Sequence, residues 1–222
     1  QIQIGADASF QGLVDLIDMQ ALYFEGSFGE AVRTADIPPE IMETALEKRE
    51  RLIDELSMFS DELMEKALEG DVTRELLLAV LRRATIERRI VPLFMGSAYK
   101  NRGVQLLLDA VVRYLPNPTE VQNEALELGR DGEETSFVLS NDADDELVAH
   151  AFKLEDGPYG QLTYLRLYQG RLHKGADIVN VRTGKKVKVG RIGRMHADQM
   201  EDIERADAGD IVALFGIDCA SG

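Results

Sequence analysis

The hydrophobic pattern of the first 25 residues predicts short β-strands. Apolar and polar positions alternate at Ile2 and Ile4 and over residues 12–18, and a further apolar run covers residues 21–24. A period of two is typical of strands that bury one face. We therefore expect the chain to begin with strands.

The pattern then changes to that of amphipathic helices, and three helix starts can be recognised. Pro38-Pro39 opens the first helix. Ser60 is expected to cap a shorter helix that ends at Gly70, and Thr73 to cap a third helix that ends near Glu87. Five apolar positions share one face of the first helix: Ile41, Ala45, Leu52, Ile53 and Leu56.

Residues 91–115 combine an apolar run, a tight turn and a helix. The run 91–95 predicts a buried strand, Gly96-Ser97-Ala98 a turn, and the following residues a helix that starts near Val104 and stops at Pro116. A strand that leads through such a turn into a helix exposes backbone N–H groups at the carboxyl end of a sheet, where α/β folds bind ligands. A Gly-Ser-Ala turn can also be a simple connection between a strand and a helix. The residues alone therefore leave open whether the turn binds a ligand.

The second half of the chain has a different pattern. Residues 119–146 are polar, acidic and poor in aromatic side chains, which is typical of a linker between domains. Residues 147–222 form short apolar stretches separated by glycine-containing turns, with no room for helices. Five or more strands are expected, including those at 148–154, 162–168, 178–182, 186–192 and 211–215. This spacing predicts a small β-barrel, and therefore two domains in the chain.

Charge is segregated along the chain. The net charge is −15, but nine of the acidic residues lie within 121–146, and the barrel region is nearly neutral. Part of that region holds six cations and no acid: Arg182, Lys185, Lys186, Lys188, Arg191 and Arg194. Because these cations partly alternate with apolar residues, one side of the strands would face a core and the other would carry the charge. Both a solvated hairpin face and a phosphate-contacting patch fit this pattern, and an acidic chain can still carry an RNA-facing patch.

No catalytic constellation is recognisable in the sequence. The chain contains no G-x-x-x-x-G-K-[ST] loop, no Asp-x-x-Gly and no Asn-Lys-x-Asp, the motifs that would cradle a triphosphate, hold magnesium and read guanine. The three histidines are far apart, and the single cysteine, Cys219, excludes an internal disulfide and favours a reducing compartment. No apolar run is long enough to span a membrane. Because there is no initial methionine, we expect a piece of a longer protein.

Long stretches of the sequence resemble one protein family. Residues 96–118 (GSAYKNRGVQLLLDAVVRYLPNP) closely resemble the end of the GTPase domain of elongation factor G, the ribosomal translocase. Residues 151–153, 160–170, 194–197 and 208–210 resemble its β-barrel second domain. Residues 10–16 and the Pro38-Pro39 helix resemble the insert that the family carries within its GTPase domain. Residues 116–123 and 215–222 are most similar to the mitochondrial-type factor and its bacterial relatives.

The resemblance implies an α/β GTPase remnant with an α+β insert subdomain, followed by an all-β translation-factor barrel. It assigns residues 1–90 to the insert, 91–118 to the final strand and helix of the GTPase domain, 119–146 to an acidic linker and 147–222 to the barrel. In this family the Ser-Ala of the last guanine motif contacts the base. This role falls on Ser97 and Ala98, with Gly96 and Lys100 as their neighbours.

The resemblance also implies a function for the intact protein, of which this chain would be an internal fragment. The intact factor would hydrolyse GTP, with Mg²⁺, to move tRNA and mRNA through the ribosome, in the cytoplasm or in the mitochondrial matrix of a eukaryote. Because the phosphate loop and switches are missing, we expect this chain alone to bind no nucleotide and to be inactive.

Three partners are expected from the resemblance, and none of them is a membrane. They are small-subunit rRNA at the barrel, the ribosomal stalk protein at the insert, and the rest of the GTPase domain. Two alternatives stay open. One is a ribosome-recycling or release-type translational GTPase, and the other is a stand-alone RNA-binding β-barrel with a helical cap.

Overall fold

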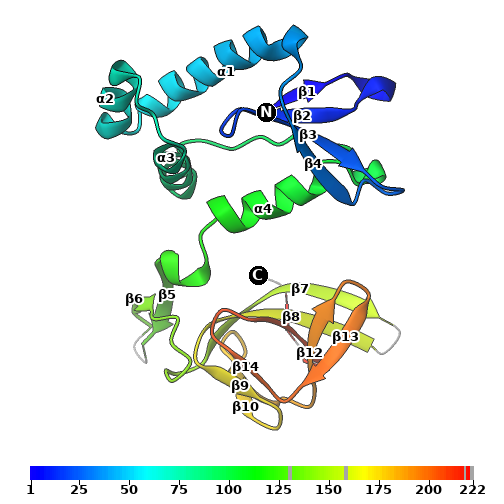
Figure 1. Cartoon of the computed structure of the whole chain (residues 1–222). Coiled ribbons are helices and arrows are strands. Elements are labelled where there is room, and N and C mark those ends of the chain that lie inside the picture. Colours follow the sequence, from blue (N-terminus) through cyan, green and yellow to red (C-terminus); the bar gives the residue numbers. More distant parts are fainter. Residues whose placement is uncertain (130–131, 158–159, 218, 221–222) are drawn as a thin grey trace. The chain divides into compact units, whose positions relative to one another are not determined.

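The computed structural model describes residues 1–129, 132–157, 160–217 and 219–220. The chain divides into two compact units, Gln1–Pro116 and Asn117–Gly222 (Figure 1). The boundary falls at the Pro116-Asn117-Pro118 sequence, close to the predicted end of the first helix-containing region. Among the helices of the described residues, none has the length and apolar character needed to cross a membrane.

Unit 1 begins with an antiparallel sheet whose four strands follow the order β1-β2-β3-β4. The strands are β1 (Ile2–Ile4), β2 (Gly12–Asp15), β3 (Gln20–Glu25) and β4 (Ala31–Ala35), and a short 3-10 turn, Asp7–Ser9, lies between β1 and β2. The first three strands confirm the prediction from the alternating pattern. The fourth was not predicted, because four of its five residues are exposed and it lacks a regular apolar face.

The three predicted helices are confirmed together with their caps. They are α1 (Pro39–Ser57), α2 (Asp61–Glu69) and α3 (Arg74–Ile86). The Ser60 hydroxyl accepts a hydrogen bond from the Leu63 N–H at 3.3 Å, and the Thr73 hydroxyl accepts one from the Leu76 N–H at 3.3 Å. Gly70 ends α2 in the left-handed conformation, with φ 73°, which glycine adopts without steric cost.

Two apolar clusters hold unit 1 together. In the first, Val14 of β2 and Leu16 just after it pack on Ile37 and Ala45, so the start of α1 covers this part of the sheet. In the second, the end of α1 meets α2, α3 and the last helix of the unit, α4 (Val104–Tyr114). Its buried members are Leu56, Leu63, Leu77, Val80, Leu81, Ala110 and Tyr114.

The predicted strand at residues 91–95 is wrong. These residues belong to no strand, and the Met95 N–H donates to the side-chain oxygen of Gln1 at 3.1 Å rather than to a neighbouring strand. A strand exists only where another strand supplies the ladder of hydrogen bonds, and within the described residues none runs beside this segment. The α/β GTPase part of the predicted fold class is therefore not confirmed. The predicted helix after it is α4, which ends before Pro116.

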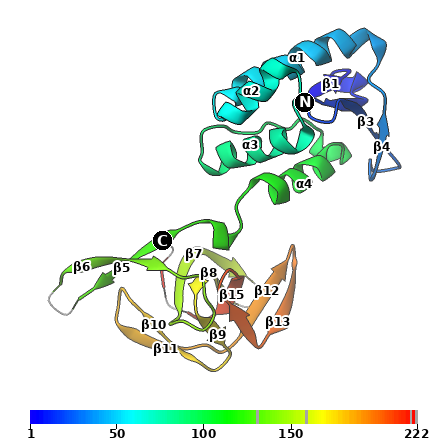
Figure 2. The same ribbon diagram turned by 60° about the vertical axis from the view of Figure 1, so that its left-hand side comes forward.

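Unit 2 contains a barrel-like arrangement of short sheets (Figure 2). Its main sheet has five strands in the order β13-β12-β15-β8-β7, and two-stranded sheets β10-β11 and β14-β9 complete it. The core includes Leu167, Leu172, Ile192, Val212 and Leu214, each less than 2% exposed. The strand bounds are β7 (Val148–Gly157), β8 (Gly160–Gln169), β9 (Arg171–His173), β10 (Asp177–Asn180), β11 (Lys185–Lys188), β12 (Ile192–His196), β13 (Gln199–Ile203), β14 (Arg205–Asp207) and β15 (Ile211–Phe215).

One predicted barrel strand is in fact two. Residues 186–192 were expected to be continuous, but β11 ends at Lys188 and β12 begins at Ile192. Between them Val189 is 1% exposed and pairs its backbone with a turn, donating to Ala176 O at 2.8 Å and accepting from Gly175 N–H at 2.7 Å. This pairing turns the chain from one sheet to the next, so the cations at its two ends lie on different hairpins.

The region predicted to be a linker contains secondary structure. A 3-10 turn, Pro118–Glu120, precedes a hairpin of β5 (Asn123–Leu128) and β6 (Glu134–Leu139). Most residues of the two strands are exposed, so no regular apolar face marked them in the sequence. The following segment is tied to the barrel by Gln169, which accepts from the Ser140 N–H at 3.1 Å and donates to Glu146 O at 3.0 Å.

Candidate functional site

The predicted ligand turn is a small closed loop. The backbones of Ser97 and Arg102 pair in both directions, with N···O distances of 2.8 and 3.0 Å. Between them residues Ala98–Lys100 form a 3-10 turn, and Asn101 adopts φ 50°. A Cβ on Gly96 would lie 2.5 Å from Arg102 O, so this position admits only glycine without rearrangement. The sequence Gly-Ser-Ala thus specifies a narrow turn with a fixed backbone.

The turn contains a backbone donor that has no acceptor in the part of the chain that the structure describes. Among the described residues, none accepts a hydrogen bond from the Ala98 N–H, and Ala98 and Tyr99 are exposed. A hollow of about 460 Å³ lies beside the turn. Its lining residues are Gln3, Asp7, Phe10, Phe94, Met95, Gly96, Ser97 and Lys100. A free N–H at a fixed turn can recognise a carbonyl oxygen without requiring a particular side chain.

Two residues that sequence reasoning missed hold this turn. The Arg102 guanidinium donates to Phe10 O at 2.9 Å, and the Gln105 amide donates to Gly29 O at 2.8 Å. Both bonds join residues more than 70 positions apart in the sequence. Because neither pairing has a local pattern, no signal in the sequence alone would have indicated them.

The helix that follows the turn leaves one apolar face uncovered. Ala110 and Tyr114 are buried in unit 1, whereas Leu107, Leu108, Val111 and Val112 are 45–82% exposed. Leu107 and Val111 of this face, together with residues before the turn, line a groove of about 340 Å³ whose walls are mainly apolar. The lining residues are Thr85, Arg88, Ile90, Val91, Pro92, Phe94, Leu107, Ala110, Val111, Tyr114 and Leu115. An exposed apolar area of this kind marks an interaction surface.

The six cations predicted as one patch fall into two groups. Arg182, Lys185, Lys186 and Lys188 lie on the β10–β11 hairpin, where all four are exposed and, within the described part of the chain, form no ion pair. Val187 packs on the barrel core, so Lys186 and Lys188 point to the opposite, outer face of β11. The cross-strand partner of Lys188 on that face is an acid, Asp177. This hairpin keeps its cations available to a partner.

The other two cations are already engaged with acids. Arg191 donates to Asp202 at 2.6 Å and covers the Phe215 ring at 4.9 Å, and Arg194 lies 3.7 Å from Asp210. They belong to β12 and the turn before it, in the five-stranded sheet rather than in the β10–β11 pair. The structure therefore does not bring the six predicted residues together.

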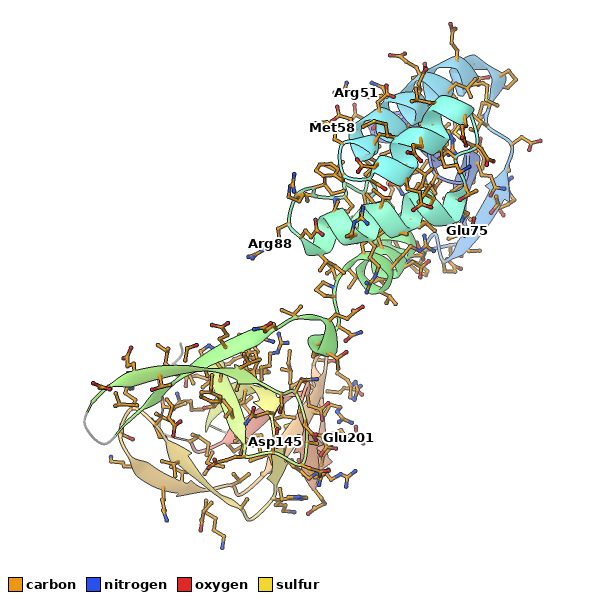
Figure 3. The ribbon with its side chains drawn as sticks, turned by 90° about the vertical axis from the view of Figure 1, so that its left-hand side faces the viewer. Arg51, Met58, Glu75, Arg88, Asp145 and Glu201 are labelled. Carbon is orange, nitrogen blue, oxygen red and sulfur yellow. The ribbon has the colours of Figure 1, made fainter. Side chains whose placement is uncertain are left out.

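The helices of unit 1 present an acidic outer surface with scattered apolar residues. Exposed acids on α1 and α2 include Glu43, Glu47, Asp54, Glu62 and Glu65. Leu46 is 55% exposed and Met58 74%, and Figure 3 shows Met58 and Arg51 at the outer side of this helix pair. The described residues contain no group of three or more His, Cys, Asp or Glu side chains placed to hold a metal ion.

Comparison with known proteins gives consistent matches. Residues 160–222 match the family model described as elongation factor Tu domain 2. The whole chain is 55% identical to a protein named elongation factor G 1 from Syntrophus aciditrophicus, and 55% identical to others of that name from Desulfotalea psychrophila and Treponema pallidum. The chain covers 32% of the length of each of these relatives, so it spans about a third of them.

The solved structures contain a similar chain as well. A crystal structure from Thermus thermophilus matches with a TM-score of 0.73 and 25% identity, covering 100% of this chain and 30% of that one. This likeness supports the mostly β translation-factor barrel with some helices. The predicted likeness to elongation factor G is confirmed by the relatives at 55% identity.

Proposed function

Because this chain belongs to the elongation factor G family, we propose that it is part of a GTPase that drives the movement of tRNA and mRNA through the ribosome. The observation that carries this proposal is the 55% identity, over the whole chain, to proteins named elongation factor G. The family and the absence of a phosphate loop together assign hydrolysis to the intact factor. This chain contributes recognition and docking.

The guanine base is assigned to the turn at Gly96, Ser97 and Ala98. The Ala98 N–H has no acceptor among the described residues and lies in a turn with a fixed backbone, which suits the carbonyl oxygen of guanine. The bound nucleotide, GTP or GDP with Mg²⁺, supplies the phosphoanhydride bond that the intact factor hydrolyses. The residues of this chain hold the base only, and the chain alone is expected to retain no nucleotide.

The apolar face of α4 and the segment at 91–95 are assigned to the rest of the GTPase domain. In this assignment residues 1–90 form the insert, and residues 91–118 supply the final strand and helix of the parent sheet. The exposed Leu107, Leu108, Val111 and Val112 support it, because their burial against a sheet would remove a large apolar surface from water. Residues 91–95 would also gain the strand partner that the described residues of this chain do not provide.

Two further surfaces are assigned to the ribosome, in the cytoplasm. The free cations of the β10–β11 hairpin suit the phosphates of small-subunit rRNA, and the acidic surface of α1 and α2 suits the ribosomal stalk protein. A recycling or release factor would use the same surfaces, and the names of the matched relatives favour translocation.

The guanine assignment is tested by Ala98→Pro in the full-length factor that contains this chain. Proline replaces the N–H with a ring methylene, which is tolerated at the first position of a helical turn, and Ser97 has the extended backbone that proline requires of the preceding residue. We expect the affinity for GDP to fall by about tenfold, the effect of losing one hydrogen bond. The affinity for 2-aminopurine riboside diphosphate, which lacks the guanine carbonyl oxygen, should not change.

The comparison of the two nucleotides separates loss of the contact from general damage. An equal loss for both nucleotides, or no loss for either, would show that the Ala98 N–H does not face the guanine oxygen. The chain alone serves as a further control. Micromolar binding of a fluorescent GTP analogue to it would contradict the assignment of the other nucleotide contacts to the rest of the factor.

A further inference from the structure

The β3–β4 hairpin of unit 1 touches the ligand turn at a position where only glycine fits. Gly29, at the tip of the hairpin, is buried and adopts φ 64°. A Cβ there would lie 2.9 Å from both Lys100 O and Asn101 O, so the hairpin backbone packs directly against the turn. Figure 1 shows this tip beside the start of α4. The position of the turn is therefore coupled to the sheet of the preceding segment.

Gln105 forms the polar link across this contact. Its Nε2 group donates to Gly29 O at 2.8 Å and to Asn101 O at 3.4 Å. One acceptor belongs to the hairpin tip and the other to the loop that contains the ligand turn. The Gln105 side chain, on the first turn of α4, therefore joins this helix to the hairpin tip and to the loop of the ligand turn.

The hairpin tip is itself held in place. The Glu30 carboxylate accepts a hydrogen bond from the Phe28 N–H at 2.8 Å, and β3 and β4 remain paired up to Glu25 and Ala31. A link to a tip that is fixed in this way restrains the turn. The same link to a disordered loop would restrain nothing.

The orientation of Gln105 has a cost. Because Nε2 serves the two carbonyl oxygens, Oε1 is buried and has no hydrogen-bond partner among the described residues. A buried acceptor without a partner destabilises a fold, and a leucine of similar size at this position would avoid that penalty. Glutamine at this position therefore adds little to the overall stability of the fold. Its contribution is to fix the position of the turn.

We propose that Gln105 is a positioning residue for guanine recognition, which sets the direction of the Ala98 N–H by tying its loop to the tip of the β3–β4 hairpin. This inference rests on the proposed role of the turn at Gly96–Ala98. Gln105 acts through the loop and does not itself touch the base.

The first test uses amide hydrogen exchange in the chain itself, with Gln105→Leu and Gln105→Glu. Both substitutions keep the approximate size of the side chain and remove its N–H donors. We expect exchange at Asn101 and Arg102 to accelerate about fivefold or more, because their protection depends on the closed loop. Exchange in α3 should not change. Gln20→Leu, which makes the same replacement at an exposed position of β3, is the control and should leave the loop as it is.

The second test measures nucleotide affinity in the full-length factor. Gln105→Leu and Gln105→Glu should weaken GDP binding about threefold to tenfold without weakening 2-aminopurine riboside diphosphate, since only the former uses the Ala98 N–H. A residue with a merely structural role would weaken both nucleotides or neither. The thermal unfolding midpoint of Gln105→Leu should stay close to that of the unmodified protein.

The outcomes separate this inference from the proposed function. If Ala98→Pro changes the preference for GDP over the 2-aminopurine nucleotide and the Gln105 variants do not, Gln105 is not a positioning residue. If none of these variants changes the preference, the guanine role of the turn is refuted, and the inference with it. Unaltered exchange at Asn101 and Arg102 in both Gln105 variants would also overturn the inference.

Discussion

The β10–β11 hairpin and the β12–β13 hairpin belong to the same barrel, and both carry cations, but they use them differently. On β10–β11 the cations Lys185, Lys186 and Lys188 form no ion pair within the described part of the chain. Beside β12 and on it, Arg191 and Arg194 face Asp202 and Asp210. A cluster of basic residues in a sequence therefore does not by itself reveal a binding surface. The pairing with acids decides which charges remain available.

The largest expected effect follows from removing the free cations. Lys185→Gln, Lys186→Gln and Lys188→Gln together, in the full-length factor, should weaken ribosome binding by about tenfold or more. The slope of log affinity against log salt should fall by about two to three, because each phosphate contact releases counterions. The measurement is equilibrium binding at several salt concentrations.

The paired cations provide the matched control for this experiment. Arg191→Gln with Arg194→Gln removes two charges from the same barrel, but those charges are already neutralised by Asp202 and Asp210. We expect ribosome affinity and its salt dependence to remain nearly unchanged. Equal losses in the two variants would remove the distinction between the hairpins.

A smaller effect is expected from a cation that serves the fold. Arg171 of β9 donates to Asp207 of β14 at 2.6 Å, and both side chains are about one-third exposed. Arg171→Met should lower the free energy of unfolding of the barrel only modestly, because Asp207 would lose its charged donor in a pair that water already screens. Amide exchange of β9 and β14 measures this change. Arg205→Met, which removes the more distant and more exposed partner of Asp207, should lower the stability less than Arg171→Met does.

The same pair gives the barrel a dependence on acid pH. The Arg171 hydrogen bond holds the pKa of the Asp207 carboxyl below its usual value near 3.8. A lowered pKa in the folded state stabilises the protein fully above the unfolded pKa, and this contribution is lost as the pH falls through the folded pKa. The contribution of the Arg171–Asp207 pair to the stability of the barrel should therefore be constant near neutral pH and decline below about pH 4. In Arg171→Met this decline should be weaker, and an unchanged acid profile would refute the assigned cause.

The sequence predicted those elements whose signals are local. Helices α2 and α3 were found because Ser60, Gly70 and Thr73 mark their ends, and α1 because Pro38-Pro39 marks its start. The strand at 91–95 was predicted wrongly because an apolar run does not show whether a partner strand exists. Strands β4, β9, β13 and β14 were missed because they are short and have no long alternating run.

The candidate site was predictable only in part for the same reason. The motif marked Gly96, Ser97 and Ala98, whose narrow turn is built from neighbouring residues. The contacts of Arg102 and Gln105 that hold this turn join distant segments and left no trace in the pattern. Likewise, the six cations are close together in the sequence. The structure separates them into two groups, because Asp202 and Asp210 pair with Arg191 and Arg194 but not with the cations of the β10–β11 hairpin.

We propose that the β10–β11 hairpin is the RNA-facing surface of the barrel. It is tested most directly by a photo-cross-linking residue at Val181, which is 87% exposed in the turn of this hairpin and leaves every cation in place. The control carries the same residue at the exposed Glu201 of β13, labelled in Figure 3. On the ribosome, position 181 should cross-link to small-subunit rRNA and position 201 should not. Absence of an RNA cross-link from 181, or equal cross-linking from both positions, would contradict the claim.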